Sequence, residues 1–159
     1  MNTSKQRWGR SEWLILIAIG LGALHHIDHI LRYDHSGWPF RSEVTPFTFS
    51  LLVYPLSLTA LFWRSRPWLR VMCVGLVLVF VQFAHTFIET PKQQFGTWAH
   101  NASDEPFALH HSNLLNIQSP LLGYAAVVLS ILLSIALLCA TISLFLDARR
   151  APRAGLTNR

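Results

Sequence analysis

Cysteine and charged residues are scarce in this sequence, and each scarcity argues against a class of protein. The two cysteines, Cys73 and Cys139, lie inside apolar runs and form no Cys-x-x-Cys pair. We therefore expect neither a zinc–thiolate site nor a disulfide framework, and we expect both thiols to be buried as small hydrophobic groups. Charged residues make up 13% of the 159 residues, whereas soluble domains usually carry roughly 25%. This composition argues against a soluble domain.

A basic stripe interleaved with base-stacking aromatic residues is also missing. The formal net charge is +5, but the excess sits in short patches that flank apolar runs. That distribution is typical of membrane topology signals, so nucleic acid is not an expected partner. The length leaves room for one domain.

Apolar runs occupy most of the chain. They predict an all-α membrane protein, a bundle of four transmembrane helices. The expected spans are residues 13–33, 46–63, 69–89 and 121–146. The first is expected to remain as an uncleaved span, and Pro55 is expected to kink the second without ending it. The outer loops are then residues 34–45 and 90–120.

The longer outer loop contains a pattern typical of a helix start. In Ser103-Asp104-Glu105-Pro106 a serine cap is followed by acidic residues and by a proline whose missing N–H costs little there. The pattern predicts a short interfacial helix over residues 107–118, before Pro120.

Basic residues orient the predicted bundle. Three basic groups fall on one side of a four-span protein: Lys5, Arg7 and Arg10; Arg64, Arg66 and Arg70; and Arg149, Arg150 and Arg153. The positive-inside rule places this side, with both termini, in the cytoplasm. We expect the chain in a plasma membrane or a bacterial inner membrane, surrounded by membrane lipid.

Histidines are concentrated in the outer part of this topology. The segment Leu24-His25-His26-Ile27-Asp28-His29-Ile30-Leu31-Arg32-Tyr33 continues the first apolar run without a turn signal. Ionisable groups at membrane depth are costly and by default mark a functional site. The other five histidines fall in the same outer part: His35, His85, His100, His110 and His111.

Helical geometry predicts that two polar stripes meet. At about 1.5 Å per residue, His29 and His85 reach the same level on the first and third spans, and Glu89 comes level with Arg32. At about 100° per residue, each stripe lies on one face of its helix. The stripes are His25, Asp28, His29, Arg32 and Tyr33 on the first span, and Gln82, His85, Thr86 and Glu89 on the third.

The leading hypothesis is a metal site for zinc, iron or copper, because imidazole and carboxylate groups bind all three. The expected ligands are His25, His29, His85 and Glu89, with His110 and His111 capping the site from the loop. Asp28 and His26 are the expected catalytic or proton-relay groups, and Arg32, Tyr33 and Gln82 the expected cofactor-binding groups. Such a site suits an oxidoreductase or a hydrolase that acts on a lipid-like or quinone-like molecule.

Two alternatives stay open at this point. In the first, His29 and His85 are the axial ligands of a b-type haem, and Arg32 lies near a propionate. In the second, no cofactor binds, and the polar stripes hold helices together or line a pocket for a lipid or quinone. Asp28 can then pair with Arg32 four residues on. In this second alternative the chain is a non-enzymatic membrane subunit that works as a homo-oligomer or with a partner membrane subunit.

The spacing His25-x-x-x-His29 resembles the first histidine box of membrane fatty-acid desaturases and hydroxylases. Those enzymes have two further boxes with paired histidines. Here His110 and His111 are paired, but no histidine lies two or three residues before them. The resemblance therefore ends at the first box.

Overall fold

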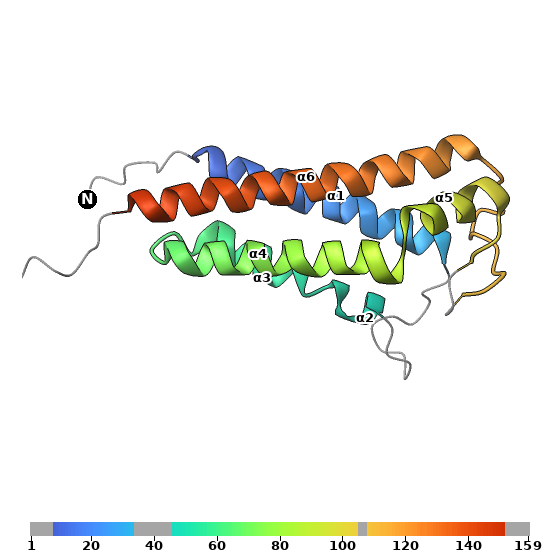
Figure 1. Cartoon of the computed structure of the whole chain (residues 1–159), viewed down its shortest axis with the longest axis horizontal. Coiled ribbons are helices and arrows are strands. Elements are labelled where there is room, and N and C mark those ends of the chain that lie inside the picture. Colours follow the sequence, from blue (N-terminus) through green and yellow to red (C-terminus); the bar gives the residue numbers. More distant parts are fainter. Residues whose placement is uncertain (1–7, 34–45, 105–107, 152–159) are drawn as a thin grey trace, which may run out of the picture.

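The structure, a computed structural model, describes residues 8–33, 46–104 and 108–151, and every regular element in them is helical. The elements are α1 (Arg10–Arg32), α2 (Pro46–Ser50), α3 (Val53–Phe62), α4 (Pro67–Phe83), the π-helical turn η1 (Ala84–Ile88), α5 (Pro91–His100) and α6 (Pro120–Arg150). In Figure 1 the long helices run along the molecule, and α5 lies at the end opposite the first turn of α1. The predicted all-helical class is confirmed for these residues. The predicted loop 34–45, which contains His35, lies outside them.

Three helical segments are long and apolar enough to cross a membrane. They are Arg10–Arg32, Pro67–Ile88 and Pro120–Arg150, which match three of the four expected spans. Their outward faces expose large apolar side chains such as Ile17, Met72 and Leu138. Contiguous exposed apolar surface is unfavourable in water and suits contact with lipid. These features are consistent with a multi-pass membrane protein.

The expected span over residues 46–63 is broken. A turn at Leu51 and Leu52 separates α2 from α3, and this apolar segment is shorter than the three candidate spans. Pro55 accounts for the break, because it has no N–H to donate to the Leu51 carbonyl and its ring crowds that oxygen. The Leu51 carbonyl accepts instead from the N–H of Tyr54, at 3.1 Å. The described residues therefore hold three candidate spans, and the expected span over residues 46–63 is replaced by two short helices.

Small side chains bring α6 close to α1 and α4. Ala18 of α1 and Ala136 and Ala140 of α6 are buried where these helices meet, as is typical of helix contacts in membranes. The buried core also contains larger residues from four helices: Ile15, Leu61, Val74, Val77, Val81, Leu133, Leu137 and Leu144. This core fixes the helices that carry the polar groups described below.

A buried ion cluster joins the helices at the end where α1 begins. The Glu12 carboxylate accepts from Arg70 Nη2 at 2.6 Å and from the Gly9 N–H at 2.8 Å, and Arg64 Nε lies 3.5 Å away. Arg70 Nε also donates to the Ala60 carbonyl at 2.6 Å. We call Glu12, Arg64 and Arg70 the arginine cluster.

The second outer loop contains a short helix, but in a different segment from the one predicted. Thr90 Oγ1 accepts from the Gln93 N–H at 3.4 Å, and the Gln93 side chain accepts from the Thr90 N–H at 2.7 Å. Together with Pro91 at the first helical position, this reciprocal capping box starts α5. The helix therefore covers Pro91–His100.

The expectation of a helix over residues 107–118 is wrong. Within this stretch, residues 108–118 form turns and irregular backbone. Asn113 Oδ1 accepts from the Ile117 N–H at 3.1 Å, and its Nδ2 donates to the Ile117 carbonyl at 2.8 Å. Side-chain bonds of this kind offer the backbone an alternative to a helix.

A glycine lets α5 lie directly against α6. A Cβ atom at Gly123 would come within 2.8 Å of the Phe95 carbonyl oxygen and ring, so only glycine fits there. This close approach brings the buried Gln94 of α5 to Ser130 of α6.

Candidate metal centre

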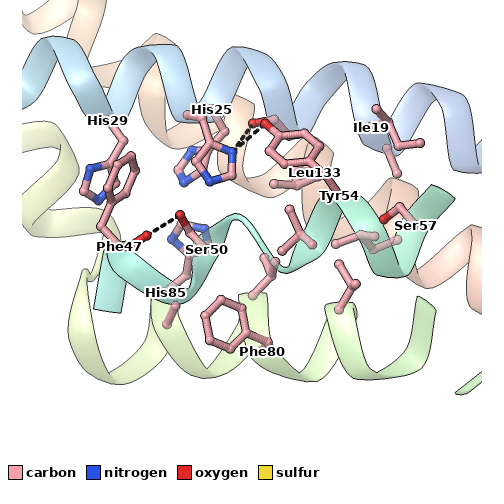
Figure 2. Close-up of a pocket in the computed structure, with 18 of the residues that line it drawn as sticks. Ile19, His25, His29, Phe47, Ser50, Tyr54, Ser57, Phe80, His85 and Leu133 are labelled. Atoms are coloured by element: carbon pink, nitrogen blue, oxygen red, sulfur yellow. Dashed lines mark hydrogen bonds between the residues drawn. The ribbon is translucent and has the colours of Figure 1, made fainter. Parts of the chain in front are cut away.

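A cavity of about 80 Å³ lies inside the bundle at the end nearer α5, bordered by α1, α2, α3, α4, η1 and α6 (Figure 2). Its lining has two parts. The polar end consists of His25, His26, His29, Tyr54, His85 and Glu89. The apolar chamber consists of Ile19, Val77, Phe80, Val81, Leu133 and Leu137. A volume of roughly 10–15 Å³ admits one water molecule, so this cavity has room for several waters or a small ligand group.

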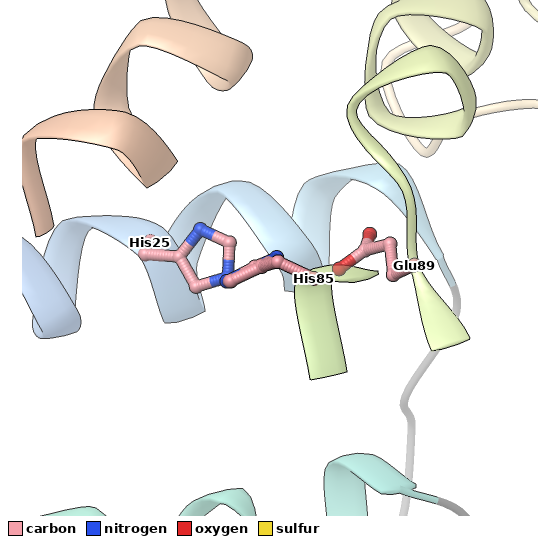
Figure 3. A group of neighbouring side chains, drawn as sticks. All are labelled: His25, His85 and Glu89. Carbon is pink, nitrogen blue, oxygen red and sulfur yellow. The ribbon is translucent and has the colours of Figure 1, made fainter. Parts of the chain in front are cut away.

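Three potential ligands gather at the polar end. His25, His85 and Glu89 offer ligand atoms that all lie within 4.8 Å of one another, and Figure 3 shows His85 between the other two. The rings of His25 and His85 meet edge to face, with 4.7 Å between their centroids. His25 and Glu89 are buried, and His85 is partly buried. His85 and Glu89 of the second expected stripe therefore face the first, whereas Gln82 and Thr86 of that stripe are exposed.

Arg32 orients the Glu89 carboxylate. Its Nη1 pairs with Glu89 Oε1, and the other carboxylate oxygen, Oε2, lies 3.3 Å from His29 Nε2. Arg32 Nε donates to Asp28 Oδ2 at 2.9 Å, so the expected Asp28–Arg32 contact is present. Trp98 Nε1 donates to the other Asp28 oxygen at 2.9 Å. Asp28 thus holds Arg32 in place and does not line the cavity.

The charges of this network do not balance. Asp28 and Glu89 contribute two negative charges, and Arg32 contributes one positive charge. With neutral histidines, the state that binds metal, the network carries one excess negative charge. Arg32 Nη2 is buried and has no hydrogen-bond partner among the described residues. A buried net charge is costly, so the negative charge of this network favours a bound cation, whereas the unpartnered Nη2–H favours a further acceptor.

The π-helical turn η1 places two of the potential ligands. The Glu89 N–H donates to the Ala84 carbonyl at 2.8 Å, five residues back in the chain. His85 lies within this turn, and Glu89 follows its last residue. Single π-helical turns inserted in α-helices are frequent at functional sites.

Gln94 and Ser130 contact the Nδ1 atoms of the two histidines that are potential ligands, His85 and His25. Gln94, fully buried, has its Nε2 atom 2.8 Å from His85 Nδ1. Ser130 Oγ donates to Gln94 Oε1 at 2.9 Å and lies 3.4 Å from His25 Nδ1. If the amide turns over, Gln94 Oε1 accepts from His85 Nδ1–H, which leaves Nε2 of that ring free for an ion. Hydrogen bonds of this kind orient metal-bound histidines.

His26 and Tyr54 form a second polar pair at the cavity wall. The Tyr54 hydroxyl lies 2.8 Å from His26 Nδ1, and the same nitrogen lies 3.0 Å from the Gly22 carbonyl. Both side chains line the cavity, but neither belongs to the group of three potential ligands.

Tyr33 and Gln82, two expected cofactor-binding residues, do not line the cavity. Tyr33 is buried behind His29, at 5.2 Å between ring centroids, and its hydroxyl lies 3.4 Å from Thr97 Oγ1. Gln82 is exposed on α4, and Ser134 of α6 donates to its side-chain oxygen at 3.4 Å. Gln82 therefore bridges two helices.

His110 and His111 are exposed in the turn after the α5 region. Their backbone pairs with Ser103: the His110 N–H donates to the Ser103 carbonyl at 2.8 Å, and the Ser103 N–H donates to the His111 carbonyl at 3.0 Å. Among the described residues, the group of potential metal ligands does not include them. The structure does not bring this pair to the site.

Sequence reasoning missed Gln94, Ser130 and Trp98. Ser130 is a polar residue inside an apolar run, where a small side chain usually serves close helix packing. Gln94 and Trp98 lie in a loop that the sequence did not identify as helical. The capping pattern at Thr90 was the sequence signal for the start of α5. In that helix the side chains of Gln94 and Trp98 are buried.

Comparison of the chain with protein-family models, with curated proteins and with solved structures gave no match. The spacing that resembles a desaturase histidine box places the rings of His25 and His29 at 6.3 Å between centroids. The geometry of the side chains is therefore the basis for assigning a function.

Proposed function

We propose that this chain is a metal-dependent membrane enzyme, an oxidoreductase or a hydrolase, that binds one divalent transition-metal ion through His25, His85 and Glu89. The observation that carries the proposal is the meeting of these ligand atoms within 4.8 Å beside a cavity. The excess negative charge of the surrounding network supports it, because a divalent ion reverses that charge. The substrate is a lipid-like or quinone-like molecule that reaches the cavity from the membrane.

The donor atoms fit such an ion after a small contraction. Zinc lies about 2.0–2.2 Å from nitrogen and oxygen ligands, so two ligands of a tetrahedral ion are roughly 3.4 Å apart. The widest gap of 4.8 Å must therefore close by about 1.4 Å. Small rotations of the three side chains toward the ion would supply this movement.

Two histidines and one carboxylate form a ligand set that leaves positions open for chemistry. The same combination holds catalytic zinc in some hydrolases and iron in the oxygenases that use a facial triad. The open positions would face the cavity. When bound there, the ion would polarise a substrate oxygen or lower the pKa of a bound water.

The neighbouring residues have separate roles in this proposal. Arg32 and His29 fix the orientation of Glu89, and Gln94 and Ser130 fix the two histidine rings. His26 and Tyr54 line the cavity as a hydrogen-bonded pair, and His26 is the proposed proton-relay group. Asp28, expected as a catalytic residue, acts through Arg32 and is a positioning residue.

Metal analysis tests the proposal directly. We expect about one zinc, iron or copper ion per chain in detergent-purified protein by elemental mass spectrometry. His85→Ala should lose the ion, whereas His100→Ala, which removes an exposed histidine of α5, should retain it. Full metal content in both His85→Ala and Glu89→Gln would show that the ligand assignment is wrong.

The haem alternative has less support from the geometry. His29 stacks on Phe47 with 4.5 Å between centroids and faces Glu89, while His85 packs against His25. A macrocycle between His29 and His85 would have to separate all of these contacts. An intense visible absorption band in the purified protein would favour haem. A folded, colourless and metal-free protein would favour the non-enzymatic subunit.

We also propose that the metal centre lies toward the outer face of the membrane. Arg64, Arg66, Arg149 and Arg150 belong to the opposite end of the bundle in Figure 1, where α6 ends and α4 begins. In a background without the two native cysteines, Ser112→Cys should react with an impermeant maleimide on intact cells, and Ser65→Cys should not. The reverse labelling pattern would place the site in the cytoplasm.

A further inference from the structure

Tyr54 of α3 and His26 of α1 meet at the polar end of the cavity. The Tyr54 hydroxyl lies 2.8 Å from His26 Nδ1, and the centroids of the two rings are 5.3 Å apart. Figure 2 shows this hydroxyl directed toward the histidines, on the side away from Ser57. The same His26 nitrogen lies 3.0 Å from the Gly22 carbonyl oxygen. One nitrogen atom therefore has two oxygen neighbours within hydrogen-bond distance.

The Gly22 carbonyl determines where the proton of His26 lies. A carbonyl oxygen has no proton and only accepts, so its contact with Nδ1 is a hydrogen bond only when Nδ1 carries the proton. Without that proton, two lone pairs would face each other at 3.0 Å. A protonated Nδ1 has no free lone pair and cannot accept from the Tyr54 hydroxyl. The two oxygens then share the Nδ1–H group, as in other three-centre hydrogen bonds.

This assignment leaves the hydroxyl proton of Tyr54 available for another acceptor. The Tyr54 oxygen accepts from His26, which is its hydrogen-bond partner within the described part of the chain. The side chain lines the cavity, so an acceptor for its proton has to come from the cavity itself. A donor without an acceptor is costly inside a protein, and a molecule that supplies one is therefore favoured there.

We propose that Tyr54 is a ligand-binding residue that donates a hydrogen bond from its hydroxyl to an acceptor atom of the molecule in the cavity. This inference rests on the proposed metal site, because the ion holds one end of the bound group and Tyr54 contacts the other. It names the part of the substrate that enters the site. That part is a carboxylate or a similar anionic group, with one acceptor atom for the ion and a second for Tyr54.

The size and the charge of the site agree with such a group. A cavity of about 80 Å³ holds several water molecules at roughly 10–15 Å³ each, so the three non-hydrogen atoms of a carboxylate fit. The network of Asp28, Glu89 and Arg32 carries one net negative charge, and a bound divalent ion leaves one net positive charge. The ion attracts an anion from any direction, whereas the hydrogen bond from Tyr54 selects its orientation.

Azide binding to the cobalt-loaded protein tests the proposal, because azide is a small anion with an acceptor atom at each end. The visible absorption of cobalt(II) reports the binding. Tyr54→Phe keeps the ring and removes the hydroxyl, and it should weaken azide binding by about tenfold, as expected for one hydrogen bond to a charged group. Ser57→Ala removes another buried hydroxyl from the same helix and the same cavity, and it should bind azide as the wild type does.

Fluoride distinguishes the loss of this hydrogen bond from general damage to the site. Fluoride is a single atom, so it binds the ion without a second atom that extends toward Tyr54. Tyr54→Phe should therefore bind cobalt and fluoride as tightly as the wild type while its azide affinity falls. Equal azide affinity in the wild type and Tyr54→Phe would overturn the proposal, and so would a parallel loss of both anions.

NMR of the zinc-loaded wild-type protein tests the proton assignment without any change at Tyr54. Long-range proton–nitrogen correlations of isotope-labelled histidine distinguish a ring protonated on Nδ1 from one protonated on Nε2, and His26→Gln identifies the His26 signals. We expect the proton on Nδ1. A proton on Nε2 alone would mean that Tyr54 donates to His26, which would overturn this inference and leave the metal site standing. Failure of the wild-type protein to take up any metal ion would overturn the proposed function, and this inference with it.

Discussion

The two ends of the bundle contain similar buried ionic groups in opposite arrangements. At the arginine cluster, Glu12 is held by two arginines and a backbone N–H, and none of these side chains lines the cavity. At the other end, two carboxylates share Arg32, and Glu89 borders the cavity together with the histidines. The first network has one excess positive charge, and the second has one excess negative charge.

The difference distinguishes a structural ion cluster from a candidate binding site. Burial and ion pairing are common to both ends, so neither property alone indicates function. What sets the histidine end apart is an unbalanced negative charge, neutral donor atoms and free volume in the same place. The arginine cluster has donors already committed to protein acceptors. The predictions below test this contrast.

The largest stability effect is expected at the arginine cluster. Glu12→Ala leaves Arg70 buried without its carboxylate, and removal of one partner from a buried ion pair costs about 3–5 kcal/mol. Unfolding by denaturing detergent in mixed micelles should show a loss in this range. Metal content per folded chain should not change, and a loss of metal in this variant would mean that the two ends are not independent.

Metal removal should have a smaller effect, confined to the histidine end. An ion at about 100 times its dissociation constant stabilises the protein by about 2.7 kcal/mol, so a chelator should lower the midpoint of thermal unfolding. Glu89→Gln should start from the lower midpoint and should not respond to the chelator. A chelator effect of equal size in wild type and Glu89→Gln would place the ion elsewhere.

The meeting of the potential ligands His25, His85 and Glu89 was predictable, because it follows from helical periodicity, whereas the expected approach of His110 and His111 is not seen. Glu89 lies level with Arg32 and contacts it, as expected. The histidine register differs by part of a turn: His85 packs against His25, whereas the sequence estimate set it level with His29. That estimate assumed that Trp13 and Leu69 are level. The Glu12–Arg70 contact is a better reference, and counted from it His85 falls between His25 and His29.

Other features depend on tertiary contacts that periodicity does not report. The break before Pro55 was not predictable from periodicity, because it depends on the partner that the Leu51 carbonyl finds in place of the missing proline N–H. The segment after Ser103 has the composition of a helix start, but Asn113 bonds to the backbone and stabilises turns there. Gln94 and Ser130 meet only because Gly123 lets two helices approach.

The next effect in size concerns the residues that orient the ligands. Gln94→Leu and Ser130→Ala should each weaken metal affinity by about 10–100-fold, the usual cost of losing a partner of a metal-bound histidine. Competition with a calibrated zinc chelator gives the affinities. Ser134→Ala, which removes a partly buried hydroxyl one turn further along α6, is the matched control and should bind zinc as tightly as the wild type.

The smallest effect is expected from the cap of α5. Thr90→Ala removes a capping side chain, which costs about 1 kcal/mol. Hydrogen exchange should quicken in α5 and remain slow in the middle of α6. Unchanged exchange in α5 would show that its contact with α6, and not the cap, maintains the helix.

X-ray absorption at the edge of the bound metal tests the central claim most directly. In the wild-type protein the account predicts nitrogen and oxygen neighbours at about 2.0–2.2 Å, with outer-sphere scattering from two imidazole rings. His85→Ala, reloaded at high metal concentration, should lose the signal of one ring, and His100→Ala should keep both. A wild-type protein without bound metal, or a spectrum without imidazole scattering, would contradict the account.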